Sequence, residues 1–429
     1  MSPTAHVVGA GIAGLSAAIR LAEAGHKVAL YEAAPAAGGR CRSYYDQALD
    51  LVIDNGNHLL LSGNTAALDY LGRIGSLASL HGPDTTVFDF ADLASGERWR
   101  LRPNAGRIPW WLLASTRRVP RTAPWQYLSA LRLLRAPPTA TVPEIISCAG
   151  ALYERLWRPI LLAGLNTEPR EASATLAAAI LRETLAAGGG ACRPLVALQG
   201  LSKTYVEPAL EFLSARNVAI RFGMRLYRIA FEKDRAVELE FGSEREKLAS
   251  DDVLIIAVPP WVAKDLLPGL EAPDAFRAIM NAHFRMKPPR GHPVITATLG
   301  GLTEWLFAYP EHLSVTISSA DALLGRPREK LAAEIWGEVA ALTDLSAKLP
   351  PWQIVKERRA TFAATPAQDA KRPPVGTRWR NVMLAGDWTQ TGLPATIEGA
   401  VRSGYGAASL ILGTPCDMPQ LRKIPSGAK

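Results

Sequence analysis

Apolar residues recur with two different periods along the chain and divide it into strands and helices. An apolar run at residues 6–9 predicts a buried strand, small residues at 15–24 predict a helix that ends at Gly25, and residues 27–32 predict a second strand. The second strand is largely apolar, which is typical of a parallel strand covered by helices on both faces. The chain therefore begins with a β-α-β unit, and a doubly wound sheet is expected.

The pattern changes twice further along the chain. After about residue 83 the sequence is rich in tryptophan, arginine and proline, and then in alanine and leucine, until three glycines at 188–190 mark a boundary. Strands are predicted again at 218–222, 225–231, 236–241, 252–259 and 381–386, a loop at 365–376 and a closing helix at 398–412. We therefore predict one domain from residues 1–83, 190–262 and 376–416, a second from 84–189 and 263–375, and a loose tail at 417–429.

Length and composition exclude several classes of protein. A chain of 429 residues with 48% hydrophobic and 21% charged residues is long and apolar enough for two folded units, so a disordered or disulfide-stapled protein is excluded. The four cysteines never lie close together, so neighbouring residues provide no redox motif and no metal site. We find neither a secretory signal before the first strand nor an apolar run long enough to span a membrane, and we expect a cytoplasmic protein.

The first motif that carries chemistry is the glycine-rich turn after the first strand. Gly9, Gly11 and Gly14 stand at the spacing of a dinucleotide-binding fingerprint, and Glu32 ends the next strand. The first glycine allows a tight turn, the second lets a pyrophosphate approach the backbone, and the third allows close packing of the helix. Glu32 is placed to accept hydrogen bonds from ribose hydroxyls, so the turn predicts a dinucleotide site.

Three further features favour FAD over NAD as the dinucleotide. Gly38, Gly39 and Arg40 offer bare backbone and a guanidinium to a second side of the pyrophosphate. Gly386 and Asp387 follow the last strand, where the carboxylate is placed to bind ribityl hydroxyls unless it only caps a turn. Glu398 opens the closing helix, whose N-terminus is expected to face the flavin ring. No flavinylation motif is present, so noncovalent FAD is predicted.

These motifs resemble the FAD-dependent amine oxidase and phytoene desaturase superfamily over nearly the whole chain. A narrower resemblance, to the squalene-associated branch of hydroxysqualene dehydroxylases, is carried by five segments at 38–43, 54–58, 59–63, 386–389 and 393–398. The resemblance implies an α/β fold, in which a Rossmann-like FAD-binding domain of the glutathione-reductase type carries an inserted α+β substrate-binding domain.

The resemblance also implies an activity, namely reductive removal of the hydroxyl of hydroxysqualene, a C30 isoprenoid, in squalene or hopanoid biosynthesis. Upstream hydroxysqualene or presqualene diphosphate synthases are the partners it suggests. The alternatives are a carotenoid or phytoene-type desaturase or isomerase, an amine oxidase, or a flavin-carrying membrane protein without activity of its own.

The segment at 54–58 supplies the candidate catalytic residues. We expect Gly56 to let the backbone pass close to the flavin ring, and His58 and Asp54 to act as a general acid or polar anchor. The alternative for His58 is a hydrogen bond within its own loop, and Asp54 has a similar alternative.

A basic and aromatic block lies in the middle of the predicted insertion. Nine arginines and four tryptophans occur between residues 98 and 135, and no acidic residue occurs between residues 98 and 143, although the net charge of the whole chain is only +8. This composition is typical of a segment that lies on an anionic membrane surface, and it is equally compatible with a solvated arginine face over a helical core. No motif indicates nucleic-acid binding. We therefore expect peripheral attachment to the inner face of the cytoplasmic membrane.

Overall fold

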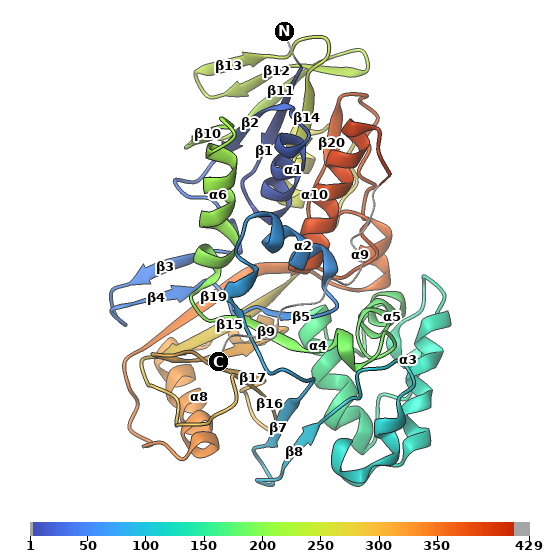
Figure 1. Cartoon of the computed structure of the whole chain (residues 1–429), viewed down its shortest axis with the longest axis vertical. Coiled ribbons are helices and arrows are strands. Elements are labelled where there is room, and N and C mark those ends of the chain that lie inside the picture. Colours follow the sequence, from blue (N-terminus) through green and yellow to red (C-terminus); the bar gives the residue numbers. More distant parts are fainter. Residues whose placement is uncertain (1–2, 416–429) are drawn as a thin grey trace.

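The computed structural model describes residues 3–415, so the tail predicted at 417–429 lies outside the described residues. A five-stranded parallel sheet forms one half of the molecule (Figure 1). Its strands lie in the order β10 (Ala219–Phe222), β2 (Lys27–Glu32), β1 (Thr4–Val8), β14 (Val253–Ile256) and β20 (Val382–Leu384). All four strand pairs are parallel, which confirms the predicted α/β fold.

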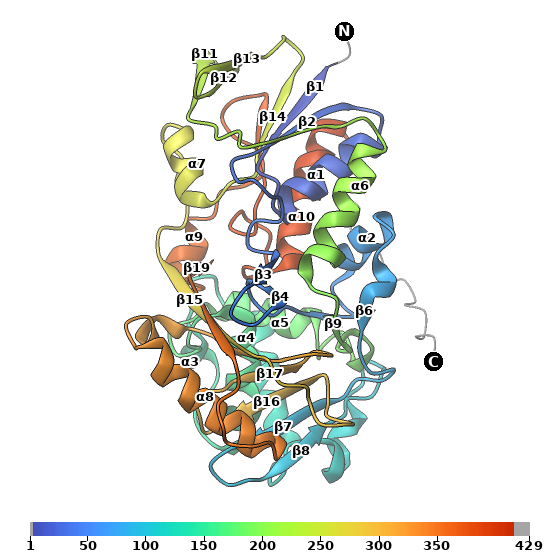
Figure 2. The same cartoon turned by 90° about the vertical axis from the view of Figure 1, so that its left-hand side faces the viewer.

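The two faces of this sheet are buried by different elements. Val7 and Ile255 pack with α1 (Ile12–Glu23), α2 (Thr65–Arg73), α6 (Glu207–Ser214) and α10 (Ile397–Leu412). Val8 and Ile256, one position later, pack with α7 (Pro260–Leu266) and with the small sheet of β11 (Arg228–Glu232), β12 (Arg235–Phe241) and β13 (Glu244–Lys247). Figure 2 shows α1, α6 and α10 side by side on one face. The strands are apolar on both faces for this reason.

A seven-stranded mixed sheet forms the other half. Its order is β19 (Trp352–Phe362), β15 (Phe276–Phe284), β18 (Leu313–Ile317), β17 (Trp305–Ala308), β16 (Ile295–Leu299), β7 (Phe88–Asp92) and β8 (Arg98–Leu101). The helix α8 (Arg328–Thr343) packs on this sheet. The parallel pair β7 and β16 joins segments from the two ranges predicted for the insertion.

Helices fill the rest of the insertion. They comprise α3 (Val142–Ile145), α4 (Arg158–Leu165), α5 (Ala174–Glu183), a π-helix at Tyr153–Trp157, and 3-10 helices at Trp110–Leu113, Ser115–Arg117 and Pro124–Arg135. The arginine and tryptophan block therefore contains short 3-10 segments after β8.

Short elements make up the remainder of the described chain. They are the hairpin β3 (Ser43–Asp46) and β4 (Leu51–Asp54), the sheet β5 (Leu59–Leu61), β9 (Pro194–Ala197) and β6 (Leu80–His81), a π-helix at Ser202–Val206, and 3-10 helices at Leu77–Ser79, Gly189–Ala191 and Ala320–Leu323.

The prediction of a loop at 365–376 is wrong in part, because this segment contains the helix α9 (Pro366–Ala370). Its N-cap is Thr365, whose side chain accepts a hydrogen bond from the Gln368 N–H, and proline at the first helical position is compatible with a helix start. The strands predicted at 225–231, 252–259 and 381–386 have different bounds in the structure, where they are β11 at Arg228–Glu232, β14 at Val253–Ile256 and β20 at Val382–Leu384.

Candidate functional site

The glycine turn between β1 and α1 has the geometry that a dinucleotide requires. A Cβ atom on Gly9 would lie 2.3 Å from the Ala257 carbonyl oxygen, and one on Gly14 would lie 1.8 Å from the Gly9 carbonyl oxygen, so both positions need glycine for packing. A Cβ on Gly11 would have no atom within 4 Å. The turn therefore opens at Gly11, where the fingerprint places the pyrophosphate.

Glu32 is fixed at the end of β2 beside this turn. Its two carboxylate oxygens accept hydrogen bonds from the Ala10 and Ala34 N–H groups, each at 2.8 Å. Each oxygen has a further lone pair, and the residue is partly exposed. The carboxylate is thus oriented by the backbone and is able to accept hydrogen bonds from ribose hydroxyls.

The second glycine pair lies directly against the first turn. Gly38 donates its N–H to the Ala10 carbonyl at 2.8 Å and forms a β-bridge with Gly11. A Cβ on Gly39 would lie 3.5 Å from the Gly11 Cα. The two glycine motifs therefore form one continuous backbone surface, which fits a cofactor with a pyrophosphate.

Arg40 and Asp387 meet across the sheet, although the sequence suggested separate roles for them. The Arg40 Nη2 atom lies 2.6 Å from the Asp387 Oδ1 atom. Burial opposes the charge on Arg40, but the Asp387 carboxylate outweighs it and raises the pKa of Arg40. The Arg40 side chain is still 46% exposed, so the pair lines an accessible space. Gly386 directly precedes Asp387 in the sequence and donates its N–H to the Ser403 hydroxyl.

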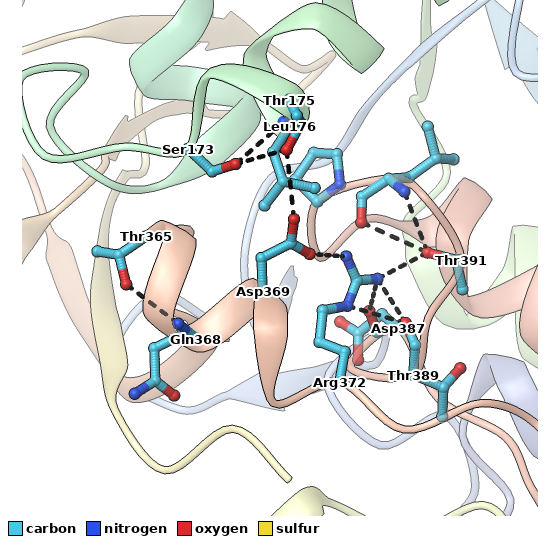
Figure 3. A network of polar contacts seen from close by, with 12 residues as sticks. Ser173, Thr175, Leu176, Thr365, Gln368, Asp369, Arg372, Asp387, Thr389 and Thr391 are labelled. Atoms are coloured by element: carbon cyan, nitrogen blue, oxygen red, sulfur yellow. Dashed lines mark hydrogen bonds and ion pairs between the residues drawn. The ribbon is translucent and has the colours of Figure 1, made fainter. Parts of the chain in front are cut away.

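Arg372 holds the loop that carries Asp387, and the sequence analysis did not predict this residue (Figure 3). Its side chain is 1% exposed. The guanidinium donates to the carbonyl oxygens of Thr389 and Asp387, to the Thr391 hydroxyl and to the Asp369 carboxylate. Arg372 is therefore a positioning residue for the cofactor loop.

The carboxylate of Glu398 forms hydrogen bonds to protein groups. Its two oxygens accept the Ala66 and Ala67 N–H groups at 3.1 and 2.8 Å, and Arg402 donates to it at 2.8 Å. These two N–H groups belong to the first turn of α2, which has no other side-chain cap. The side chain of Glu398 therefore caps a neighbouring helix, and its predicted role in cofactor binding stays a prediction.

The segment at 54–58 lies between the cofactor motifs and the seven-stranded sheet. Asp54 accepts hydrogen bonds from the Ser43 hydroxyl at 2.6 Å and the Leu201 N–H at 2.9 Å. Burial raises the pKa of Asp54 to about 6, although these two hydrogen bonds oppose the shift. A Cβ on Gly56 would lie 3.1 Å from the Asn281 side-chain amide nitrogen, so Gly56 allows a close approach to β15.

His58 follows in the same segment, directly before β5. Burial lowers the pKa of His58 to about 4, and the Arg40 guanidinium acts in the same direction. The imidazole is therefore neutral at pH 7, which favours a hydrogen-bonding anchor over a charged acid. Asp54, with its raised pKa, is the better holder of a proton near neutral pH.

A polar cluster that the sequence analysis missed lies next to this segment. We use the name polar cluster for Asn57, Asn281, His283, Tyr309, Ser314 and Thr316. The Asn57 side-chain amide donates to the Ser314 hydroxyl at 2.8 Å and to the Thr316 hydroxyl at 2.9 Å. The Tyr309 hydroxyl donates to the Asn57 Oδ1 atom at 3.1 Å. The centre of the cluster is thus a side chain of the 54–58 segment.

The histidine of the polar cluster is neutral. The Ser314 hydroxyl accepts a hydrogen bond from the Asn57 side-chain amide and lies 2.9 Å from the His283 Nδ1 atom. Burial lowers the pKa of His283 to about 3, His312 acts in the same direction, and the Asp54 carbonyl opposes the shift.

The sequence contains one signal for the polar cluster, which is that polar residues recur at every second position on two strands. Asn281 and His283 are two residues apart on β15, and they pair in register with Thr316 and Ser314 on β18. The four side chains therefore share one face of the sheet. Without the pairing of the strands, neither pair of polar residues indicates a site.

The fold and the cradle of Gly11, Glu32, Arg40 and Asp387 define an FAD-type dinucleotide-binding oxidoreductase. The family model described as flavin containing amine oxidoreductase matches residues 12–412, and the chain belongs to this family. The chain is similar in fold to a cyclohexylamine oxidase of Brevibacterium oxydans, with a TM-score of 0.70 and 17% identity over 96% of this chain and 99% of the other.

Closer relatives define the branch. A hydroxysqualene dehydroxylase of Rhodopseudomonas palustris is 57% identical over 96% of this chain and 99% of its own length. A hydroxysqualene dehydroxylase of Sinorhizobium fredii is 52% identical, with the same two coverages. Within the flavin family the chain therefore belongs to the hydroxysqualene dehydroxylases, which confirms the resemblance. A 15-cis-phytoene desaturase of Synechococcus elongatus is only 23% identical, over 95% of each chain.

Proposed function

We propose that this protein is an FAD-dependent oxidoreductase that converts hydroxysqualene to squalene in squalene and hopanoid biosynthesis. The observation that carries this function is the identity of 52–57%, over nearly the whole length, to relatives that bear the name hydroxysqualene dehydroxylase. The reaction replaces a carbon–oxygen bond by a carbon–hydrogen bond and releases the hydroxyl as water. It consumes two electrons and two protons.

The described residues fit FAD, since the cradle has open space at Gly11 and bare backbone at Gly39. When bound in its reduced form, FAD supplies the hydride. The chain's own residues hold the cofactor: Glu32 accepts ribose hydroxyls, and the Arg40–Asp387 pair lines the space beyond the glycines. Arg372 keeps Asp387 in place.

The polar cluster supports removal of a hydroxyl more directly than removal of hydrogen from a polyene. A leaving hydroxyl needs hydrogen-bond donors or a proton, whereas a desaturase handles only carbon and hydrogen. Asn57 and Thr316 are partly exposed, while the rest of the cluster is buried, so the cluster is accessible through these two residues. We assign the polar cluster to the substrate hydroxyl, with Asp54 and His58 remaining the predicted proton holder and anchor.

Tyr309→Phe tests this assignment. Loss of the hydroxyl that orients Asn57 should lower kcat for hydroxysqualene by about tenfold or more, with FAD content unchanged. The matched control is Tyr227→Phe, because Tyr227 is 65% exposed and outside the site. Equal rates for Tyr309→Phe and wild type would remove the cluster from the mechanism.

The function itself is tested with reduced enzyme under anaerobic conditions. Mixing photoreduced holoenzyme with hydroxysqualene should give squalene and the spectrum of oxidised flavin in equal amounts. Phytoene should remain unchanged with the oxidised enzyme. Formation of a conjugated polyene from phytoene, together with no oxidation of the flavin by hydroxysqualene, would replace this function with desaturation. Oxidation of an amine would indicate an amine oxidase. The absence of turnover with every substrate would indicate a flavin-carrying partner protein without activity of its own.

We further propose that the protein attaches to the inner face of the cytoplasmic membrane, where the upstream synthases would deliver the substrate. Six large apolar side chains between residues 108 and 131 are 49–79% exposed: Ile108, Trp110, Leu113, Trp125, Leu128 and Leu131. Exposed apolar residues among arginines are typical of an interfacial segment. None of the helices within residues 3–415 is long and apolar enough to cross a membrane.

Sedimentation with vesicles tests the attachment. Replacement of Trp125, Leu128 and Leu131 by serine should release the protein from vesicles that contain phosphatidylglycerol. Replacement of Tyr44, Val52 and Tyr227, which are exposed outside the insertion, is the control. Equal binding of both variants would contradict this attachment.

A further inference from the structure

A groove of about 700 Å³ lies between the insertion and the β9 strand. Arg102 and Arg117 line it from the basic block, and Arg193, which precedes β9, lines it from the other side. Arg193 lies far from the block in sequence, so only the fold brings the three arginines to one groove. Asp84 also lines the groove, but its single negative charge does not balance the three arginines, so the groove has a net positive charge.

The three arginines of the groove have no counter-ion among residues 3–415. Within residues 3–415, their guanidinium groups form no hydrogen bond and no ion pair. Two other arginines of the block differ, since Arg100 pairs with Asp89 at 2.6 Å and Arg118 donates to two backbone carbonyls. Three unpaired positive charges around one concave surface favour an anion that accepts several hydrogen bonds, as a phosphate does.

Hydrogen bonds between the Asn104 side chain and nearby backbone groups hold the groove in shape. The Asn104 side chain donates to the carbonyl oxygens of Gly106 and Ile108 at 3.1 and 3.0 Å, and it accepts the Trp111 N–H at 3.2 Å. A Cβ on Gly189 would lie 2.4 Å from the Asn104 carbonyl oxygen. The glycines at 188–190 thus allow this loop to pack closely, and a ligand would meet a preformed surface.

Apolar side chains stand next to the charges. Trp110 lines the groove, is 53% exposed and stacks under the Arg117 guanidinium, with 4.8 Å from the guanidinium carbon to the ring centroid. Ile108 and Leu113, close in the chain, are 79% and 77% exposed. A ligand with a phosphate and an attached apolar chain satisfies both parts of this surface. The uncharged isoprenoid substrate offers nothing to the arginines.

We propose that this groove binds the phosphate of an anionic phospholipid headgroup, with the acyl chains lying over Ile108, Trp110 and Leu113. The inference rests on the membrane attachment proposed above and gives it a specific lipid site. The site is separate from the FAD cradle, and it would orient the insertion on the membrane.

Calorimetric titration of the full-length holoenzyme with monomeric dihexanoyl phosphatidylglycerol tests the proposal. The triple variant Arg102→Gln, Arg117→Gln, Arg193→Gln should bind at least tenfold more weakly than wild type. The control, Arg107→Gln, Arg132→Gln, Arg135→Gln, removes the same charge from arginines outside the groove and should change binding by less than threefold. Asp84→Asn should bind severalfold more tightly, a gain that misfolding cannot produce.

Three outcomes would overturn the proposal. Equal losses in the two triple variants would show a diffuse field of charge without a site. Inorganic phosphate that binds as tightly as the lipid would assign the groove to free phosphate. An unchanged affinity in Asp84→Asn would place the ligand outside the groove. Turnover of detergent-dispersed hydroxysqualene by wild type is measured separately, so failure of the lipid site is distinguishable from failure of the proposed function.

Discussion

Replacement of Arg372 by lysine should weaken both FAD binding and folding, because Arg372 fixes the loop that carries Asp387. The guanidinium makes five hydrogen bonds through three nitrogens, to Thr389 (two), Asp387, Thr391 and Asp369, at 2.5–3.2 Å. A lysine ammonium has three donors at a single point and is unable to span this set.

The magnitude follows from the hydrogen bonds that lysine cannot make. At least two are lost, each worth about 1.5–3 kcal/mol for a charged donor. Because the side chain is 1% exposed, solvent does not replace them. We expect the free energy of unfolding to fall by about 3 kcal/mol, within the range for disruption of a buried ionic group. If half or more of this free energy is also lost from FAD binding, because the cofactor loop is no longer held in place, the Kd for FAD rises by about 10- to 100-fold.

Flavin fluorescence and urea unfolding measure the two effects. The FAD Kd is obtained from quenching as apoprotein is titrated, and stability is measured with and without saturating FAD. Arg378→Lys is the matched control, because Arg378 is exposed in the same segment and its guanidinium stacks on Trp379. Wild-type affinity in Arg372→Lys would refute the positioning role, and a loss of stability without a loss of affinity would reduce Arg372 to a structural residue.

Three further predictions concern the cradle and its surroundings. Gly11→Val should fold but lack FAD in absorbance spectra, because its backbone is extended (φ −73°) and only the cofactor space is filled; Gly72→Ala should keep FAD. The raised pKa of Asp54 means that its carboxylate destabilises the fold as pH rises from about 4 to about 6, so Asp54→Asn should gain up to ~3 kcal/mol of stability at pH 8 and nothing at pH 4 in urea unfolding. Glu398→Gln should lose about 1–3 kcal/mol in the same assay, since an amide offers one acceptor to the α2 N–H groups, and no loss would contradict the capping role.

The parts of the site that the sequence predicted are local. A turn between a strand and a helix determines where Gly9, Gly11 and Gly14 lie, so the fingerprint carries its own geometry. The pairing of Arg40 with Asp387 joins residues 347 positions apart and depends on sheet order, which no local pattern contains.

The polar cluster and the contacts of the Glu398 carboxylate were not predicted, for the same reason. Asn281 and Thr316 have a meaning only once β15 and β18 are paired in register. Glu398 stands where a helix start is expected, and its sequence neighbourhood does not show that another helix, α2, begins against it. Tertiary packing decides the direction of both side chains.

The order of strands in the parallel sheet also determines when the protein can acquire its cofactor during synthesis. β1 pairs with β14, about 250 residues later, and β14 pairs with β20, whose residues are among the last fifty of the chain. Arg40 leaves the ribosome long before Asp387 exists, so the nascent chain carries an unfinished nucleotide site with exposed strand edges. The flavin site is therefore complete only after β20 has been synthesised, and a chain truncated before β20 lacks both the last strand of the parallel sheet and Asp387.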